Sequence, residues 1–375
     1  MKRQLRILMP TIYFPPRVGG IESHVHSLAK ELVRKGHQVT IITTRTESDS
    51  PWQETVDGIE VRRTLSFGKH FVGWILSSLV AAIPTCTRAQ AFDLIHCHTF
   101  AFALGGRLAS SLYGKPLVIT VHSSHFLRLA SRPLMRPPLK LVLSKADVLL
   151  STSKEIDRVV RELLPGAATY PIVNGIDTQR FKATEPMLQR NANDFIVVCP
   201  RRLVEKNGVE FLIRAVPLVR SDRNLRVYIA GDGPLAGYLK RLARELGVGD
   251  RITFLGSVAN DRMPGLYSSA DLIVIPSLIE ATSIAALEAM ACKRVVAASR
   301  VGGLPEIIDD SVGILFEPRS PEAIARAIEK AMKSEAIDQM GTLARKRVEA
   351  NWSIASVAGF HEQIYWKCLG VDSDA

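Results

Sequence analysis

The chain has 375 residues and a mass of 41.3 kDa; 47% of its residues are apolar and 23% are charged. This composition is that of an ordinary globular protein and excludes the collagen-like, disordered and disulfide-stapled classes. The net charge of +11 is unevenly spread, because residues 1–173 hold 22 basic and 12 acidic residues. A basic half of this kind indicates a surface for anions, such as nucleic acid, anionic lipid or a phosphorylated substrate.

The cysteines indicate the cellular compartment. There are five of them, and none belongs to a Cys-x-x-Cys pair, which argues against a disulfide framework and fits a reducing cytosol. The N-terminal segment MKRQLRILMP is basic, but its apolar run is too short for a signal peptide. We therefore expect a cytoplasmic protein, peripheral on the inner face of the cell membrane if the apolar stretch described below lies on a bilayer.

Short apolar runs alternate with helical patterns along the first half. After the first run, apolar residues recur at helical spacing from Ile21 to Val33, and Gly36 ends that pattern. This alternation is typical of a parallel sheet built from βαβ units. The runs with the length of buried strands are 5–9, 38–44, 93–97, 116–121 and 147–152.

A longer apolar stretch, Phe71 to Cys86, interrupts this series. It has 16 residues, includes Pro84, and falls short of the roughly 20 residues that a membrane-spanning helix needs. Two interpretations stay open: a buried or half-buried helix, or an interfacial helix that lies on a membrane.

The pattern weakens over residues 174–194, which are polar and are expected to form a linker. A second series follows, with strands expected at 195–200, 225–231, 251–256, 271–276 and 294–299, and helices at about 208–220, 234–247, 260–269 and 284–291. The sequence therefore predicts an α/β protein with two doubly wound, Rossmann-like parallel-sheet domains, at 1–173 and 195–350, facing across a cleft. Residues 351–375 would form a C-terminal helix that packs back on the first domain.

Two loops at expected strand ends have features of phosphate sites. Gly19 and Gly20 lie just before the first helix, where a bare backbone lets an anion reach the helix N-terminus; a turn that needs positive φ would also explain them. Arg201, Arg202 and Lys206 follow the first strand of the second domain. They could neutralise a phosphate or form a solvated basic loop.

A third segment, IAGDGPLAG at 229–237, resembles part of the dinucleotide-binding fingerprint. The glycine spacing fits poorly, and the strand that follows has no acid at its end to hold a ribose. A Rossmann dehydrogenase is therefore disfavoured.

The strongest local pattern is PSLIEATSIAALEAMA at 276–291. Glu280 lies in the loop after a buried strand, and Glu288 lies eight residues on, in a helix expected to start near Ser283. A carboxylate accepts two hydrogen bonds, the number needed to hold vicinal hydroxyls of a sugar or ribose. A surface helix with two acids would explain Glu288, but it leaves an acid in an otherwise apolar loop unexplained.

Histidines gather at expected strand ends of the first domain. His96 and His98 are two apart in a strand and so face the same way, and His122 and His125 follow the next strand. No carboxylate or cysteine has a spacing that supports a metal site with them, so no metal is expected. His122 could be an acid/base, a hydrogen-bond donor to a substrate, or a satisfied core residue.

Together these segments resemble the family-4 glycosyltransferases of the GT-B fold, over nearly the whole chain. The matching segments are the Gly-Gly loop with IESHVHSLAKELVRKGHQVTIITT, then DLIHCHT, VNGIDTQRF, RRLVEKNGVEFLIRA, AGDGPL, the two glutamates and VGGLPEII. The lipid-directed mannosyl- and N-acetylglucosaminyl-transferases of phosphatidylinositol are similar in layout. The resemblance implies a retaining, metal-independent transfer of a sugar from a nucleotide diphosphate sugar, such as a UDP or GDP sugar, to a hydroxyl.

The resemblance also implies roles for single residues, and it implies no metal or other cofactor. Arg202 and Lys206 would neutralise the leaving diphosphate, which Gly19 and Gly20 would approach; which of Arg201 and Arg202 meets the phosphate stays open. Catalysis would rest on His122, Glu280, Arg202 and Lys206. Glu280 would hold the transferred sugar, Glu288 the ribose and Ser257, Val258 and Ala259 the base, while Gly231, Ser283 and Ile284 complete the donor site. Tyr13 and Glu22 would contact the acceptor.

The segment 126–145, FLRLASRPLMRPPLKLVLSK, has five basic residues and no acid. With the apolar stretch Phe71 to Cys86 it could form a basic, apolar patch that meets an anionic membrane surface. That interpretation favours a lipid-linked acceptor or a cell-envelope glycan precursor; a solvated loop is the alternative.

Three other classes compete with a transferase. A nucleic-acid binder would explain the basic half, but no aromatic–basic interleaving or binding motif is present, so no nucleic acid is expected. A nucleotide-sugar epimerase or another GT-B enzyme shares the fold class. A non-catalytic sugar- or anion-binding relative is the third alternative, although both glutamates and the Arg/Lys pair are present.

Overall fold

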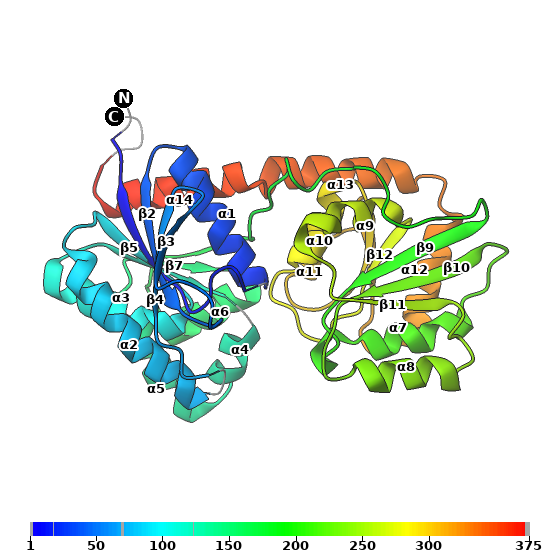
Figure 1. Cartoon of the computed structure of the whole chain (residues 1–375), viewed down its shortest axis with the longest axis horizontal. Helices are drawn as coiled ribbons and strands as arrows, with labels where there is room; N and C mark the ends of the chain where they lie inside the picture. The colour runs from blue at the N-terminus through cyan, green and yellow to red at the C-terminus, as the bar shows by residue number, and fades with distance from the viewer. Residues whose placement is uncertain (1–2, 18, 69–70, 123, 372–375) are drawn as a thin grey trace. The chain divides into compact units, whose positions relative to one another are not determined.

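The computed structural model describes residues 3–17, 19–68, 71–122 and 124–371 (Figure 1). The chain divides into two compact units, Met1–Gly175 with Ile354–Ala375, and Ile176–Ser353. Each unit has a largely or wholly parallel sheet between helices, so the predicted fold class of two Rossmann-like α/β domains is confirmed.

The first unit has an eight-stranded sheet in the order β3-β4-β2-β1-β5-β6-β7-β8. All neighbouring strands are parallel except β3 and β4, which form an antiparallel hairpin. Central strands such as β5 and β6 are buried along their whole length, because helices cover both faces of such a sheet. The strands are β1 (Arg6–Pro10), β2 (Gln38–Thr44), β3 (Gln53–Val56), β4 (Ile59–Thr64), β5 (Leu94–His98), β6 (Leu117–Val121), β7 (Val148–Ser151) and β8 (Thr169–Pro171).

The helices of this unit include one from the far end of the chain. They are α1 (Gly20–Arg34), α2 (Phe71–Ala89), α3 (Ala103–Tyr113), α4 (Ser124–Ala130), α5 (Arg136–Leu143), α6 (Lys154–Leu163) and α14 (Ile354–Cys368). In α1, Val25, Leu28 and Leu32 recur at helical spacing and share one core with Tyr365 and Trp366 of α14. The two helices lie side by side, so the C-terminal helix completes the first unit (Figure 1).

The second unit has a six-stranded, wholly parallel sheet in the order β11-β10-β9-β12-β13-β14. Its strands are β9 (Asp194–Pro200), β10 (Asn224–Ala230), β11 (Ile252–Gly256), β12 (Leu272–Ile275), β13 (Val295–Ser299) and β14 (Gly313–Phe316). Its helices are α7 (Val209–Ala215), α8 (Ala236–Glu245), α9 (Met263–Ser269), α10 (Ile284–Ala291), α11 (Leu304–Ile307), α12 (Pro321–Lys333) and α13 (Ile337–Asn351). Apolar side chains of β9, β10, α7, α8 and α12 form the main core.

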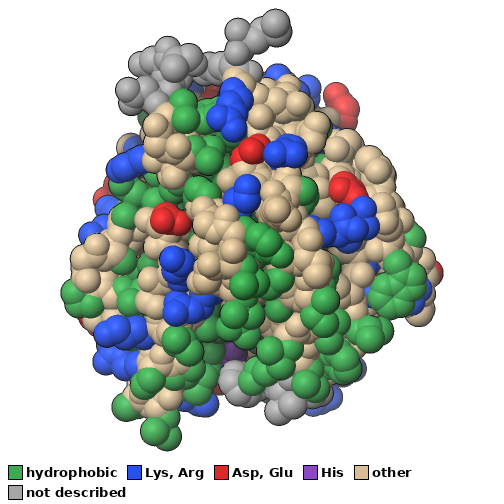
Figure 2. Space-filling view, turned by 90° about the vertical axis from the view of Figure 1, so that its left-hand side faces the viewer, with side chains coloured by type: hydrophobic (Ala, Val, Ile, Leu, Met, Phe, Trp, Pro, Cys, Tyr) green, Lys and Arg blue, Asp and Glu red, His purple; other side chains and the backbone are tan. Residues whose placement is uncertain are grey.

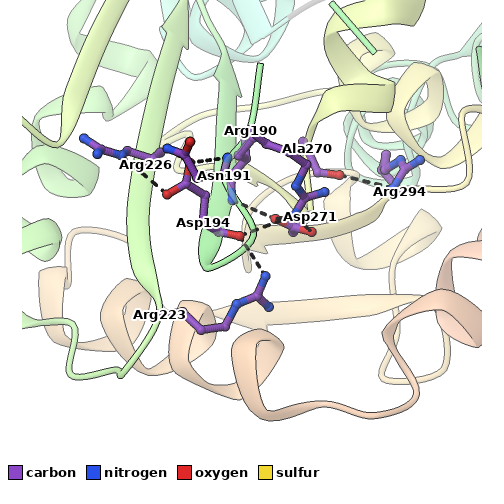
Figure 3. Close-up of polar contacts among 9 residues, drawn as sticks. Arg190, Asn191, Asp194, Arg223, Arg226, Ala270, Asp271 and Arg294 are labelled. Atoms are coloured by element: carbon purple, nitrogen blue, oxygen red, sulfur yellow. Dashed lines mark hydrogen bonds and ion pairs between the residues drawn. The ribbon is translucent and has the colours of Figure 1, made fainter. Parts of the chain in front are cut away.

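Residues 176–194, from the segment expected as a linker, belong to the second unit. The backbone N–H groups of Met187 and Leu188 donate to the Ser269 hydroxyl of α9 at 2.8 and 2.9 Å. Just beyond, the Arg190 guanidinium donates to both carboxylate oxygens of Asp271 at 2.9 Å (Figure 3). Asp271 in turn accepts from the backbone N–H of Ile196, so this network fastens the segment to the start of the sheet.

Each expected strand is present within one residue at each end, and β3, β4, β8 and β14 add to them. The apolar stretch from Phe71 forms α2, whose residues Ile75 and Ile83 are 45% and 64% exposed. Within the part of the chain that the structure describes, no helix is long and apolar enough to cross a membrane.

Candidate functional site

The candidate residues of the second unit lie on loops that follow the carboxyl ends of its strands. Two backbone links join neighbouring loops: the N–H of Leu278 donates to the Lys206 carbonyl at 2.8 Å, and the N–H of Leu203 donates to the Asp232 carbonyl at 3.0 Å. In an open parallel sheet this edge is where ligands bind. The predicted donor residues after β9, β10, β11 and β12 are therefore brought to one edge.

Arg201 and Glu280 form the central ion pair of this edge. The Arg201 guanidinium lies 2.5 Å from a Glu280 carboxylate oxygen and donates to the Ser283 hydroxyl at 2.9 Å. Both side chains are largely covered, with 11% and 17% of their surface exposed. Arg201 thus orients Glu280 and Ser283, the N-cap residue of α10, whose hydroxyl also accepts from the Ala286 N–H.

Arg202 and Lys206 differ from Arg201, because both are exposed. Among the described residues neither has an ion-pair partner. The Asn207 amide donates to the Arg202 carbonyl at 2.8 Å and fixes the loop that carries both cations. Two positive charges on a fixed loop can meet an anion without first breaking an ion pair.

Gly231 lets the loop after β10 approach the loop after β9. Its φ of +152° and the Arg201 carbonyl beside it leave no room for a side chain. Beyond β11, Ser257 and Ala259 are exposed and Val258 is half-buried. Because residues 257–259 have short side chains, the backbone of this loop can come close to a planar ring such as a nucleotide base.

Glu288 is a buried acid on the second turn of α10, four residues after Ile284. The Tyr267 hydroxyl of α9 donates to its carboxylate at 2.8 Å. Burial raises the pKa of Glu288 to about 7, while the Tyr267 hydrogen bond and the charge of Arg180 act in the opposite direction. No sequence pattern indicated Tyr267, because the contact joins two helices.

In the first unit, Gly19 is extended at φ −179° and precedes α1, which Gly20 begins. The alternative of a positive-φ turn therefore does not explain Gly19. A side chain at Gly19 would instead collide with the Glu22 carboxylate. Because that carboxylate is the end of a flexible side chain, it could move aside, so the contact does not require glycine.

Tyr13 and Glu22 are linked through Arg17, which the sequence patterns did not single out. The Arg17 guanidinium lies 3.4 Å from the centre of the Tyr13 ring, and its Nε is 3.3 Å from a Glu22 carboxylate oxygen. The Trp74 indole of α2 donates to the Tyr13 hydroxyl at 2.9 Å. The two predicted acceptor residues therefore lie in one polar group that touches the apolar helix α2.

His122 directly follows β6 and is 2% exposed. Its Nε2 is hydrogen-bonded to Nδ1 of His98 at 3.1 Å, and burial lowers the pKa of His122 to about 3. The imidazole is therefore neutral at pH 7, which excludes a resting proton donor of imidazolium type. His125 lies apart from this pair, with its ring 4.9 Å from that of Trp74.

Two family models match the chain in succession. Glycosyltransferase Family 4 matches residues 18–180, and Glycosyl transferases group 1 matches residues 181–347. An uncharacterized glycosyltransferase of Methanocaldococcus jannaschii is 32% identical over 350 residues, covering 88% of this chain and 89% of its own. This chain belongs to the family-4 glycosyltransferases.

Two further similarities bear on this family-4 glycosyltransferase. A protein of Arabidopsis thaliana that is part of a phosphatidylinositol N-acetylglucosaminyltransferase is 30% identical, over 88% of this chain and 74% of its own length. The structure of Anabaena HepE in complex with UDP-glucose matches with a TM-score of 0.78 and 20% identity, over 97% of this chain and 100% of that chain. The chain therefore has the GT-B fold and is a glycosyltransferase, as the resemblance implied.

The family matches cover every predicted site residue except Tyr13, which precedes residue 18. Arg17 also lies just outside them, and its two contacts became visible only in the folded chain. A single arginine in the loop PPRVGG was the one sequence signal available for it.

Proposed function

We propose that this glycosyltransferase moves a sugar from a nucleotide diphosphate sugar to a hydroxyl of a lipid-linked acceptor, with retention and without a metal ion. The observation that carries the donor assignment is the edge of the second unit, which combines a buried acid, Glu288, with two exposed cations, Arg202 and Lys206. A nucleotide sugar has hydroxyls, which a carboxylate can bind, and phosphates, which cations can bind, and this edge offers both kinds of group.

In this proposal Arg202 and Lys206 bind the diphosphate, because Arg201 is already held by Glu280 and Ser283. Their positive charges replace a divalent ion and stabilise the negative charge of the diphosphate as it leaves. Gly20, at the exposed start of α1, and Gly231 give the phosphates a close approach to the backbone.

Glu288 accepts hydrogen bonds from the ribose hydroxyls, and Glu280 accepts them from the sugar that is transferred. Ser283 and Ile284 offer the first backbone N–H groups of α10, and Ser257 to Ala259 receive the base. His122, neutral at pH 7, contributes a hydrogen bond to the sugar rather than a proton. The name of the structural neighbour with UDP-glucose supports a donor of this class.

The acceptor half supports a lipid-linked acceptor through its apolar surface. Helices α2 and α3 pack on each other, as do α3 and α5, and all carry exposed leucines or isoleucines. Figure 2 shows hydrophobic side chains gathered over the lower half of the viewed face, with Lys and Arg side chains beside them. We call this set the apolar face: Ile75, Leu76, Leu79, Ile83, Leu108, Leu112, Leu134 and Leu141.

The apolar face has the chemistry of a peripheral membrane contact. Leu134, which is 90% exposed, lies between Arg132 and Arg136, and each such cation adds about 1 kcal/mol near anionic lipid. The Trp74–Tyr13 hydrogen bond brings α2 to the predicted acceptor residues. The relative from Arabidopsis thaliana, named for phosphatidylinositol, supports a lipid acceptor.

The donor assignment is tested by a thermal-shift panel of UDP, GDP and ADP sugars, with and without EDTA. A ligand that binds only the folded chain raises its apparent stability, so the true donor shifts the melting temperature in both conditions. No shift with any nucleotide sugar would contradict the donor site, and a shift that EDTA abolishes would contradict metal independence. The anomeric configuration of the product, read by NMR, tests retention.

A further inference from the structure

The first unit contains a cluster of buried histidines that the proposed function uses only in part. They come from α1 (His24), β5 (His96 and His98), the residue after β6 (His122) and α14 (His361), and each is at most 3% exposed. Their rings touch: the ring centres of His98 and His122 are 5.4 Å apart, and those of His24 and His122 are 5.5 Å apart.

His96 and His361 are hydrogen-bonded to groups outside the histidine cluster. His96 is hydrogen-bonded at both ring nitrogens, to the Tyr365 and Thr120 hydroxyls at 2.7 Å each. His361 is hydrogen-bonded through Nδ1 to the Val357 carbonyl at 2.8 Å. The His96–Tyr365 bond holds α14 against the sheet, whereas the His361–Val357 bond lies within α14.

His24, His98 and His122 each keep a buried ring nitrogen without a hydrogen-bond partner among the described residues. These atoms are Nδ1 of His24, Nε2 of His98 and Nδ1 of His122. Proteins rarely leave such atoms unsatisfied, because burial of an unpaired polar group costs free energy. Nε2 of His361 is a fourth such atom, so the histidine cluster as a whole is under-satisfied.

The spacing of the three rings fits a metal ion. One ring nitrogen from each lies within 4.8 Å of those of the other two. In a tetrahedral zinc site with bonds of 2.0–2.1 Å the nitrogens are about 3.4 Å apart. In His98 and His122 the ligand atoms would be Nδ1 and Nε2, which now share a proton at 3.1 Å, and not the unpaired nitrogens of these two rings. An ion could replace that proton after a change of tautomer that moves it to one of the unpaired nitrogens.

We propose that His24, His98 and His122 bind one Zn²⁺ ion. The set is all imidazole, with no carboxylate or thiolate among the described residues that form it, and this favours zinc and its late first-row neighbours over Mg²⁺ or Ca²⁺. Burial lowers the pKa of each of the three, so the rings are in the neutral form that binds metal. No sequence pattern indicated this set of three histidines, because His24 lies far from the other two in the chain.

The site has a consequence that rests on the proposed function. His122 is the histidine assigned to the donor sugar, and a ring fixed on zinc is no longer free to make that contact. Zinc would therefore inhibit sugar transfer, in contrast to the usual role of a divalent ion beside a diphosphate.

Binding is tested first, without any activity readout. The full chain is stripped with a chelator, dialysed against Zn²⁺ and analysed for metal by mass spectrometry, with His98→Asn as the ligand variant and His26→Asn, on the same helix as His24, as the control. We expect about one tightly held zinc in the wild type and the control, and at least ~10-fold weaker binding in His98→Asn. Absence of tight zinc in the wild type, or unchanged binding in His98→Asn, overturns the site.

X-ray absorption of the zinc-loaded wild type reads the ligands without any substitution, in case His98→Asn does not fold. Three imidazoles are expected; carboxylate or sulfur ligands overturn the assignment. The inhibition is tested in the transfer assay with His24→Asn, each protein compared with its own chelator-treated activity. Inhibition should weaken at least ~10-fold in the variant. Tight binding without inhibition would leave the site standing, overturn its proposed effect on His122, and leave the transferase itself untouched.

Discussion

Replacement of Glu288 by glutamine should stabilise the second unit and weaken donor binding at the same time. Burial raises the pKa of this carboxyl from its ordinary 4.5 to about 7. Between these values the folded chain holds a proton that the unfolded chain has released, so this group's contribution to folding is full below pH 4.5 and is lost as the pH rises through 7. Above pH 7 the folded chain therefore keeps a buried charge.

The size of this stabilisation follows from the pKa shift of Glu288. With 1.36 kcal/mol for each pH unit, the buried charge costs at most about 3 kcal/mol of unfolding free energy above pH 7. Glutamine carries no charge and its amide oxygen still accepts from Tyr267. We expect Glu288→Gln to melt up to about 6–12 °C higher than the wild type at pH 8, and the difference to vanish towards pH 4.5.

Donor binding should change in the opposite direction. A hydrogen bond to a charged group contributes about 1.5–3 kcal/mol, so loss of the charge should weaken nucleotide binding and lower kcat/KM about 10–100-fold. Calorimetric titration with the donor nucleotide at pH 8 measures this, and Glu245→Gln, an exposed residue at the end of α8, is the matched control. Unchanged affinity in Glu288→Gln would refute the ribose role, and a lower melting temperature at pH 8 would refute the buried charge.

Four other variants test donor binding, folding and membrane contact separately. Arg202→Ala should raise the donor KM at least ~10-fold with little change in melting temperature. Arg201→Ala should also lower the free energy of unfolding by about 1–3 kcal/mol, because it leaves the Glu280 carboxylate without its ion-pair partner. Equal melting temperatures of the two variants would contradict this difference between Arg201 and Arg202. Gly231→Ala should destabilise the second unit by about 1–3 kcal/mol or more, seen in urea unfolding, since its φ is +152° and a carbonyl fills the space; full stability would show that the loop adapts. Ile83→Asp should reduce co-sedimentation with anionic vesicles and leave soluble-acceptor turnover intact; undiminished vesicle binding would remove α2 from the membrane contact.

Strands such as β9 and β12 could be predicted because burial on both faces gives them apolar runs. The hairpin of β3 and β4 was missed, since neither strand has an uninterrupted apolar run: β3 alternates exposed with half-buried residues, and β4 alternates buried with half-buried ones. A signal was present: Asp57 and Gly58 have φ of +50° and +79°, and an Asp-Gly pair between two strand-like runs is typical of a tight hairpin turn.

The candidate site was predictable where it depends on local sequence. Glu280, Ser283 and Glu288 lie within one loop and one helix, and their arrangement follows from helix geometry. Partners that come from other elements were not predictable: Tyr267 reaches Glu288 from α9, and Arg201 reaches Glu280 across 79 positions of the chain. Such contacts are fixed by the packing of the whole sheet, which no local pattern encodes.

The most direct test of the account is the release of nucleoside diphosphate from the stabilising donor, measured with and without a phosphatidylinositol-type acceptor. We predict release that depends on the acceptor, continues in EDTA, and is matched by a product heavier by one hexosyl or N-acetylhexosaminyl group in mass spectrometry. Turnover of the donor to another nucleotide sugar without acceptor, or no turnover with any lipid acceptor, would contradict the proposed transfer.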